Sequence, residues 1–471
     1  MQIIIDRIPH LDGVQAYEIF AGDECSFLLD SSMVHERLGK FSFAGGDPFL
    51  IFRSWGSTCH IQYRNGPGYY YHGVDSLACL NELIAKYAIS EPEPAYLPLS
   101  AGGAVGYFAY DMGRNLEKLP RSTRNDIGFP DCIMAFFDRG IILDHFQEES
   151  YIFSTGLPFQ GQEGIEHRDK RFWELSQRVQ NHSHQLPVDL NNNNACGKNL
   201  QADFSPAEYE KAVEKALDYI GKGDIYQVNL TQRFSATLES SPWELYRRLR
   251  QRNPAPFASF LCFPEGVVVS SSPERFLAQK GSRIETRPIK GTRPRGSTEE
   301  EDRSLRRELW ESSKDQAELV MIVDLERNDL SRVCNTGTVN VPELFTLEEY
   351  ATVHHLVSTV EGELSAEKNI VDVLRASFPG GSITGAPKIR AMEIIEELEP
   401  VRRGIYTGSI GYIDFGGQAD LNIVIRTFIT KNNRVYFQVG GGIVADSSPR
   451  AEYQETLDKA KALLGALGFE K

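Results

Sequence analysis

A carboxylic acid and a lysine in the second half of the chain have the chemistry needed to make and break bonds. Glu274 lies in the string Ser272–Phe276 (SPERF), and Lys290 follows sixteen positions later in the string Arg287–Thr292 (RPIKGT). At neighbouring strand ends, such an acid donates a proton and such an amine acts as a nucleophile. A buried lysine loses its proton readily, which suits that role. By itself the pattern is also typical of a structural ion pair.

Two further segments each carry a pair of carboxylates at helical spacing. Asp315 and Glu318 are three residues apart and therefore share a helix face. Glu452 and Glu455 repeat this spacing, and Lys459 follows four positions later. Two helices of this kind favour an oxygen-only site for Mg²⁺, which usually takes one or two carboxylates and several waters. Charged faces that only contact solvent are the alternative.

Three other segments have features that suit an anion. Gly380–Lys388 combines tight glycine turns with Pro387 at an expected helix start, where free N–H groups favour negative charge. Arg426 lies in an apolar segment that we expect to be a strand over 423–429, so it needs a partner such as a substrate carboxylate. Gly440–Gly442 predicts a turn. A plain loop-to-helix junction and a buried structural ion pair are the alternatives.

The elements that must position these residues differ between the two halves of the chain. Short β-like segments with glycine-rich turns fill the first 150 or so residues, among them Ser26–Leu29, Phe49–Arg53 and Ile133–Asp138. A polar stretch over about 167–199 begins as a helix near 168–179 and ends in Asn191–Asn194. Ser205–Glu208 is a capping box with proline at the first helical position. Strands are then expected at 267–271, 408–413, 423–429 and 435–439, and helices at about 298–321, 387–397 and 449–467.

Composition excludes several classes of protein. The chain has 471 residues and a net charge of −15, which argues against a general nucleic-acid binder. No stretch approaches the roughly 20 apolar residues of a membrane span. The seven cysteines are scattered with no CxxC pair, so neither a disulfide framework nor a zinc site is expected. These features indicate a reduced, cytoplasmic environment.

Many ordered strings resemble one family, the chorismate-utilising enzymes. The resemblance covers about 205–471, with a weaker match at 27–31 and 41–43. It rests on Gly223–Leu230, Ser272–Phe276, Lys314–Glu318, Val323–Leu330, His355–Ser358, Phe378–Lys388, Tyr406–Gly408 and Gly442–Ser447. It implies an α/β (α+β) fold: a two-lobed sandwich of large, mainly antiparallel sheets with helices outside. The implied regions are an N-terminal region at 1–160, a linker or surface segment at 161–204 and a chorismate-binding catalytic region at 205–471.

The resemblance also implies roles for the residues introduced above. Lys290 is the implied nucleophile, Glu274 the general acid, and His355 lies near the departing hydroxyl. Mg²⁺ is the implied cofactor, held by Glu318, Glu455 and Glu452, with Asp315 acting through water. The implied holders of the substrate and its two carboxylates are Thr292, Gly385, Tyr406, Arg426, Gly441, Gly442 and Lys459.

One position separates the branches of this family. Lys290 in Pro-Ile-Lys-Gly-Thr resembles the aminodeoxychorismate synthase component I branch, whereas anthranilate synthases usually have alanine there. Gln227 stands near where isochorismate and salicylate synthases have a water-activating lysine. The implied reaction converts chorismate and ammonia to 4-amino-4-deoxychorismate, for p-aminobenzoate and folate. An anthranilate synthase component I and a non-catalytic, tryptophan-binding regulatory homologue are the alternatives.

The resemblance implies two further partners. No Gly-x-Cys-x-Gly motif surrounds any cysteine, so ammonia is expected from a separate glutamine amidotransferase subunit in a heterodimer. The N-terminal strings resemble the segment that holds a tryptophan molecule in some members of the family. The residues concerned are Leu29, Asp30, Ser31 and Phe41.

Overall fold

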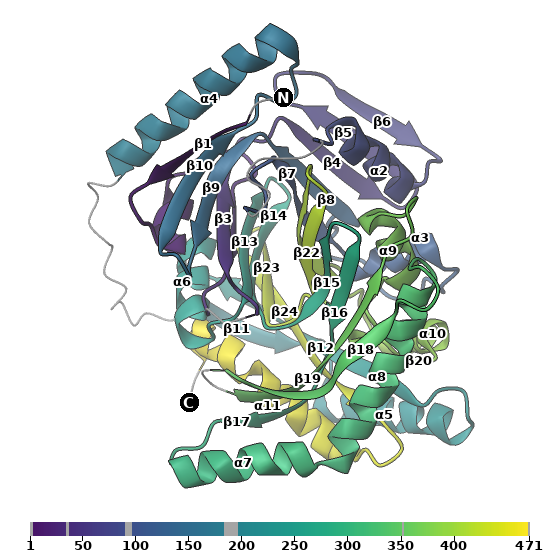
Figure 1. The fold of residues 1–471 in the computed structure, drawn as a ribbon. Coiled ribbons are helices and arrows are strands. Elements are labelled where there is room, and N and C mark those ends of the chain that lie inside the picture. The colour runs from purple at the N-terminus through teal and green to yellow at the C-terminus, as the bar shows by residue number, and fades with distance from the viewer. Residues whose placement is uncertain (1–2, 34–36, 90–96, 183–195, 351–352, 470–471) are drawn as a thin grey trace.

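Two large antiparallel β-sheets form the framework of the chain (Figure 1). A computed structural model describes residues 3–33, 37–89, 97–182, 196–350 and 353–469. Within these ranges each sheet has twelve strands. The first sheet runs in the order β1 (Ile4–Ile8), β10 (Glu149–Ser154), β9 (Arg139–Asp144), β3 (Phe41–Gly45), β2 (Phe27–Asp30), β13 (Phe257–Phe263), β14 (Gly266–Ser272), β23 (Thr427–Lys431), β24 (Arg434–Ile443), β12 (Gln227–Leu238) and β11 (Gly197–Ala202), with β20 (Gly385–Ala386) beside β12.

The second sheet lies against the first. Its order is β17 (Ile289–Pro294), β19 (Val353–Glu363), β16 (Arg283–Arg287), β15 (Arg275–Lys280), β22 (Gln418–Asn422), β21 (Ser409–Asp414), β7 (Gly103–Phe108), β8 (Cys132–Phe137), β4 (Leu50–Trp55), β5 (Thr58–Tyr63) and β6 (Gly68–His72), with β18 (Asn340–Glu349) beside β19. A core cluster joins the two sheets, because Phe43 and Ile142 of the first pack with Val105, Ile133 and Tyr412 of the second.

Helices cover the outside of this sandwich. Over the first sheet lie α4 (Gly161–His182), α6 (Pro242–Arg252), α10 (Lys388–Leu398) and α11 (Pro449–Leu467), and α5 (Pro206–Gly221) packs on α11. Over the second lie α2 (Ser76–Lys86), α7 (Glu299–Glu311) and α8 (Ser313–Ser331), with α9 (Ile370–Ser377) against α8. The short α1 (Gly13–Glu18), η1 (Tyr110–Met112), α3 (Gly113–Leu116) and η2 (Gly381–Ile383) complete the set in the described ranges. The α/β prediction with large antiparallel sheets is therefore confirmed.

The sheets do not separate the two halves of the chain. In the first sheet β2 pairs with β13, and in the second β7 pairs with β21, so hydrogen bonds join residues on both sides of the segment 161–204. The regions 1–160, 161–204 and 205–471 stay a prediction. The asparagine run 191–194 lies outside the described residues.

Local sequence signals account for most helix boundaries. The capping box at Ser205 and Glu208 starts α5 as predicted, and α11 follows the predicted range 449–467. The helix predicted over about 298–321 is instead two helices, because the Ser312 side chain caps a new start by accepting from the Asp315 N–H. Pro387 is the N-cap of α10 and not its first residue.

The strand predicted over 423–429 also needs correction. Only its end is a strand, since β23 begins at Thr427. Arg426 adopts a left-handed backbone conformation with a φ of 51°, which takes it out of a strand and into a bend between β22 and β23. Apolar composition suggested a continuous strand, but the backbone turns at this arginine.

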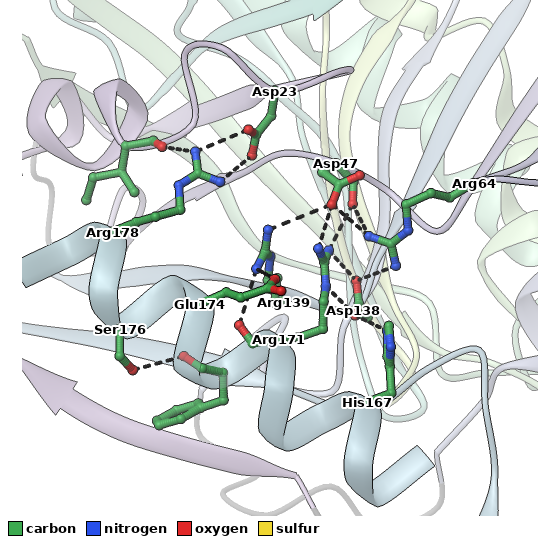
Figure 2. Close-up of polar contacts among 12 residues, drawn as sticks. Asp23, Asp47, Arg64, Asp138, Arg139, His167, Arg171, Glu174, Ser176 and Arg178 are labelled. Atoms are coloured by element: carbon green, nitrogen blue, oxygen red, sulfur yellow. Dashed lines mark hydrogen bonds and ion pairs between the residues drawn. The ribbon is translucent and has the colours of Figure 1, made fainter. Parts of the chain in front are cut away.

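Buried ion pairs attach α4 to the sheets (Figure 2). The Arg171 guanidinium donates to both carboxyl oxygens of Asp138 at 3.0–3.1 Å and to Asp47 at 2.5 Å. Arg64 bonds to Asp47 at 2.8 Å, and His167 reaches Asp138 at 3.2 Å. Asp138 is fully buried, so these contacts replace the water that its charge would need.

The structure also shows the state of the cysteines and the character of the helices. All seven cysteines lie in the described ranges, and each is a free thiol. None of the helices in those ranges is both long and apolar enough to span a bilayer.

Candidate active site

Lys290 and Glu274 meet at Ser382, at one end of the sandwich. Lys290 lies on β17, and its ammonium nitrogen donates to the Ser382 carbonyl oxygen at 3.0 Å. Glu274 lies in the turn between β14 and β15, is 4% exposed, and hydrogen-bonds to the Ser382 side chain. The predicted acid and amine therefore share a single partner, which comes from η2 more than 90 residues along the chain.

Burial shifts the pKa values of this acid and amine toward their neutral forms. It raises the pKa of Glu274 to about 7, although the hydrogen bond from Ser382 and the charge of Lys290 act in the opposite direction. Burial also lowers the pKa of Lys290, against the attraction of Glu318 and Glu274. Burial thus favours the protonated acid and the unprotonated amine, the two forms that proton donation and nucleophilic attack require.

Carboxylates from α8 and α11 lie beside the lysine. A side-chain carbon at Gly441 would lie 3.2 Å from Glu452 and 3.3 Å from Glu455, so both carboxylates face this glycine of β24. Glu452 accepts from the Ser447 hydroxyl at 2.6 Å through one oxygen, while its other oxygen is buried without a partner. Lys459 contacts Glu455 at 2.6 Å and the Gly440 carbonyl at 3.0 Å.

Glu318 interacts electrostatically with Glu455 of the same cluster of charged residues. Burial raises the pKa of Glu318 and of Glu452, and the neighbouring Glu455 adds to both shifts. Burial favours the neutral form of Glu455 as well, but Lys459 and Lys314 outweigh it and hold its pKa below the ordinary value. These carboxylates repel one another, as expected where a cation belongs.

Two of these carboxylates suit a divalent cation. Among the described residues, no three His, Cys, Asp or Glu side chains lie close enough to hold a metal ion by themselves. Mg²⁺ usually takes only one or two protein carboxylates and completes its shell with water and substrate oxygens. The unpartnered oxygen of Glu452 and the adjacent Glu455 fit that requirement. Asp315 accepts from Arg293 at 3.2 Å, lies against Gly291 beside Lys290, and its charge adds to the raised pKa of Glu318.

His355 and Thr292 form a second polar contact near the lysine. The two residues are paired between β17 and β19, and the Thr292 hydroxyl lies 2.9 Å from the His355 ring. Burial, with help from the charge of Arg426, lowers the pKa of His355 to about 3, so the imidazole is neutral. Its Nε2 is buried without a partner. Arg426 contacts Asn253 at 3.3 Å.

Gly385 and Gly442 both lie against Gln227, and we call these two residues the glycine wall. Gly385 has a φ of 148° and packs against the Gln227 backbone so closely that no side chain would fit. Both polar atoms of the buried Gln227 amide lack partners, and this amide lies against Gly442. Gln227, His355 and Glu452 thus each have a buried polar atom without a hydrogen-bond partner, and such atoms are available to a polar ligand.

Two residues of the site were missed from the sequence. Ser382 joins Glu274 to Lys290, and only its place in a glycine-rich string gave a signal. Arg403 is 2% exposed and donates to the carbonyls of Asn229 at 2.7 Å and Ile383 at 2.9 Å. Arg403 thereby connects β12 with η2, the segment that precedes Gly385. Tyr406 is buried beside Arg403, and burial raises its pKa.

The predicted tryptophan segment lies at a separate cavity between the sheets. Leu29, Asp30, Ser31 and Phe41 all line this cavity of about 440 Å³. Asp30 also has internal partners, because it accepts from the Tyr246 hydroxyl at 2.7 Å and from Arg250 at 2.6 Å.

Comparisons with known proteins agree on one family. A family model described as "chorismate binding enzyme" matches residues 39–465. Aminodeoxychorismate synthase component 1 of Klebsiella aerogenes is 40% identical over 94% of this chain and 93% of its own length. Anthranilate synthase component 1 of Thermus thermophilus is 42% identical over 94% and 92%. The solved structure of anthranilate synthase component I from Streptococcus pneumoniae TIGR4 superposes with a TM-score of 0.78 at 34% identity, covering 91% of this chain and 93% of that one.

Proposed function

This chain belongs to the family of chorismate binding enzymes, and we propose that it performs the reaction of aminodeoxychorismate synthase component 1. That reaction joins ammonia to chorismate and gives 4-amino-4-deoxychorismate, a precursor of p-aminobenzoate and folate. The observation that carries the choice of branch is Lys290, a partly buried amine beside the protonatable Glu274. Relatives of both names are about equally similar in sequence, so overall identity does not decide between them.

The first step is covalent substitution by the lysine. The unprotonated Lys290 amine adds to C2 of chorismate, the ring double bond shifts, and the C4 hydroxyl leaves as water with a proton from Glu274. Burial prepares both groups, because it favours the neutral amine and the neutral acid. Ser382 keeps them in register, since its carbonyl accepts from Lys290 and its side chain bonds to Glu274.

The second step returns the enzyme to its starting state. Ammonia adds at C4, the double bond shifts back, and the Lys290 amine departs from C2. One proton leaves the new C4 amine, and Glu274 regains one. The neutral Gln227 amide supplies no base to activate water, which favours ammonia as the nucleophile over hydroxide. Thr292 and His355 lie near the departing hydroxyl in this arrangement.

The substrate's carboxylates are held at the two ends of the site. Arg426, Tyr406 and the backbone of Gly385, Gly441 and Gly442 are the proposed holders, with Lys459 at the rim. Glu318, Glu455 and Glu452 would hold a Mg²⁺ ion, directly or through water. When bound, that ion supplies charge stabilisation at this end of the substrate.

Two partners belong to the proposal. Relatives of this chain carry the name "component 1", which supports a separate component, and we propose a glutamine amidotransferase subunit that delivers ammonia. The cavity lined by Leu29 and Phe41 is the proposed place for a bound tryptophan.

Product identity tests this function directly. The purified chain is incubated with chorismate, Mg²⁺ and ammonium, and the product is identified by mass spectrometry. A product that keeps its pyruvyl group, has one hydroxyl exchanged for an amine, and is converted to p-aminobenzoate by an added lyase supports the proposal. Anthranilate with released pyruvate would assign the chain to the other branch. No turnover in a folded protein would contradict both.

A further inference from the structure

The strand β6 is an unprotected sheet edge. It ends the second sheet, and among the described residues it pairs with β5 alone (Figure 1, upper right). All five of its residues, Gly68–His72, are exposed. Edge strands carry unpaired N–H and C=O groups, and natural proteins usually protect them with charges or proline. This strand contains no lysine, arginine, aspartate, glutamate or proline.

Three consecutive tyrosines make the same strand unusually aromatic for an exposed surface. Tyr69, Tyr70 and Tyr71 are 46%, 61% and 46% exposed. The Tyr70 ring stacks on His60 of β5, with centroids 4.3 Å apart, and lies nearly parallel to His72. A row of stacked rings therefore crosses from β5 to β6 and ends at the open edge. Tyrosine is enriched at protein interfaces, because it buries a large apolar ring and keeps a polar tip.

We propose that β6 pairs with β6 of a second copy of this chain, antiparallel about a two-fold axis at Tyr70. In that register Tyr70 faces Tyr70 of the partner, Tyr69 faces Tyr71, and Gly68 faces His72. Every cross-strand pair is free of like charges, and two of the three pair types join aromatic rings, which are favourable partners in sheets. The row of stacked rings continues across the axis, and both edges lose their unpaired backbone groups.

The second copy is favoured over other occupants by self-complementarity and by charge. Two copies with a net charge of −15 repel one another, and a strand without charged residues adds no local repulsion where they meet. The exposed area predicts the strength of the contact. At 150–250 Å² for a whole aromatic side chain, the three rings expose roughly 300 Å² per copy, or about 600 Å² for the two copies together. This total is below the 1,200–2,000 Å² of stable complexes, so the dimer is weak and reversible.

Cysteine trapping tests the register. Tyr70→Cys places two thiols at the axis, where paired strands bring Cα atoms to about 4.5–5.5 Å, within disulfide range. Tyr69→Cys places its thiols on the other face and beyond about 7 Å, where no disulfide forms. Under mild oxidation of the full chain, we expect Tyr70→Cys to form a covalent dimer at least about tenfold faster than Tyr69→Cys. The controls are the natural sequence, which monitors the seven native thiols, and Trp173→Cys on the exposed face of α4.

Sedimentation supplies the second measurement. The natural chain should shift from monomer to dimer between about 1 µM and about 500 µM, and added salt should strengthen the dimer by screening the repulsion. Tyr70→Lys places two positive charges at the axis, so it should remain monomeric while product formation from chorismate is unchanged. Equal trapping rates for the three cysteine variants, or a monomer at every concentration, would overturn the proposal. A dimer that persists in Tyr70→Lys would place the interface elsewhere.

Discussion

At the scale of single residues, burial sets the protonation states that the proposed chemistry needs. Glu274 would be ionised at neutral pH in water, but its burial raises the pKa to about 7. The same effect acts on Lys290 in the opposite sense and lowers its pKa. Burial thus shifts the carboxylic acid and the amine toward their neutral forms. The cost of burying charge is the physical reason.

Replacement of Lys290 tests the covalent step. Lys290→Ala removes the nucleophile, so product formation at low ammonium should fall by about 100-fold or more. Excess ammonium should restore part of the rate, because ammonia then attacks C4 directly. The rate is measured as 4-amino-4-deoxychorismate formed against ammonium concentration. Lys461→Ala, an exposed lysine on α11, is the matched control. An unchanged rate at low ammonium would contradict the covalent step.

The pH profile tests the general acid. Glu274 must be protonated to donate and Lys290 must be unprotonated to attack, so the pH profile of kcat/KM should bend downward at the Glu274 pKa of about 7. Glu274→Gln cannot donate and should lose about 10²–10⁴-fold in rate, with this bend absent from its profile. The measurement is kcat/KM between pH 5.5 and pH 9 at saturating ammonia, with the ammonia concentration corrected for its own ionisation. A full rate in Glu274→Gln would remove this residue from the mechanism.

At the scale of elements, two helices that cover different sheets contribute the glutamates of the proposed magnesium site. Helix α8 covers the second sheet and contributes Glu318, while α11 covers the first and contributes Glu452 and Glu455. Each helix has a charged face that looks like an ordinary solvated surface in the sequence. The antiparallel sheets bring the two faces together, and burial, with repulsion from Glu455 added, raises the pKa of Glu318 and of Glu452.

Replacement of Glu318 tests this end of the site. Glu318→Gln keeps the shape of the side chain and removes a negative charge, so the Mg²⁺ concentration for half-maximal rate should rise by about tenfold or more. Magnesium binding to the folded protein, followed by calorimetry without substrate, should weaken in parallel. Glu311→Gln at the exposed end of α7 is the control. The proposed role fails if Glu318→Gln and Glu311→Gln have the same magnesium dependence.

At the scale of the whole molecule, contacts between distant segments hold the framework together. Arg171 of α4 ties the buried Asp138, after β8, to Asp47 before β4 (Figure 2). Burial favours the neutral form of Asp138, but hydrogen bonding to His167 and the charge of Arg171 hold its pKa well below the ordinary value. The ionised carboxylate is therefore stabilised by these partners.

Removal of Arg171 tests that attachment. Arg171→Ala leaves a buried carboxylate without its main partner and should lower the free energy of unfolding by about 3–5 kcal/mol. A depressed folded-state pKa stabilises the protein above the unfolded pKa of about 3.9, and this gain is lost as the pH falls. The difference between natural and variant proteins should thus be full at pH 7 and shrink below about pH 4. Thermal and denaturant unfolding measure this difference in stability, and Lys170→Ala, at an exposed neighbouring position, is the control. Equal losses of stability in Arg171→Ala and Lys170→Ala would contradict the role of Arg171.

The sequence by itself determined which residue types were available and much of the local structure. The capping box at Ser205, the range of α11 and the pair Glu452 and Glu455 follow from neighbours within a few positions. Glu274 and Lys290 could be identified as candidates from the strings in which they lie. Only the tertiary structure decided that Ser382 joins the acid to the amine and that Arg403 supports the glycine wall. It also decided that Arg426 lies in a bend and not on a strand. The physical reason is that these contacts, and the burial that shifts each pKa, depend on strand pairing between segments far apart in the chain.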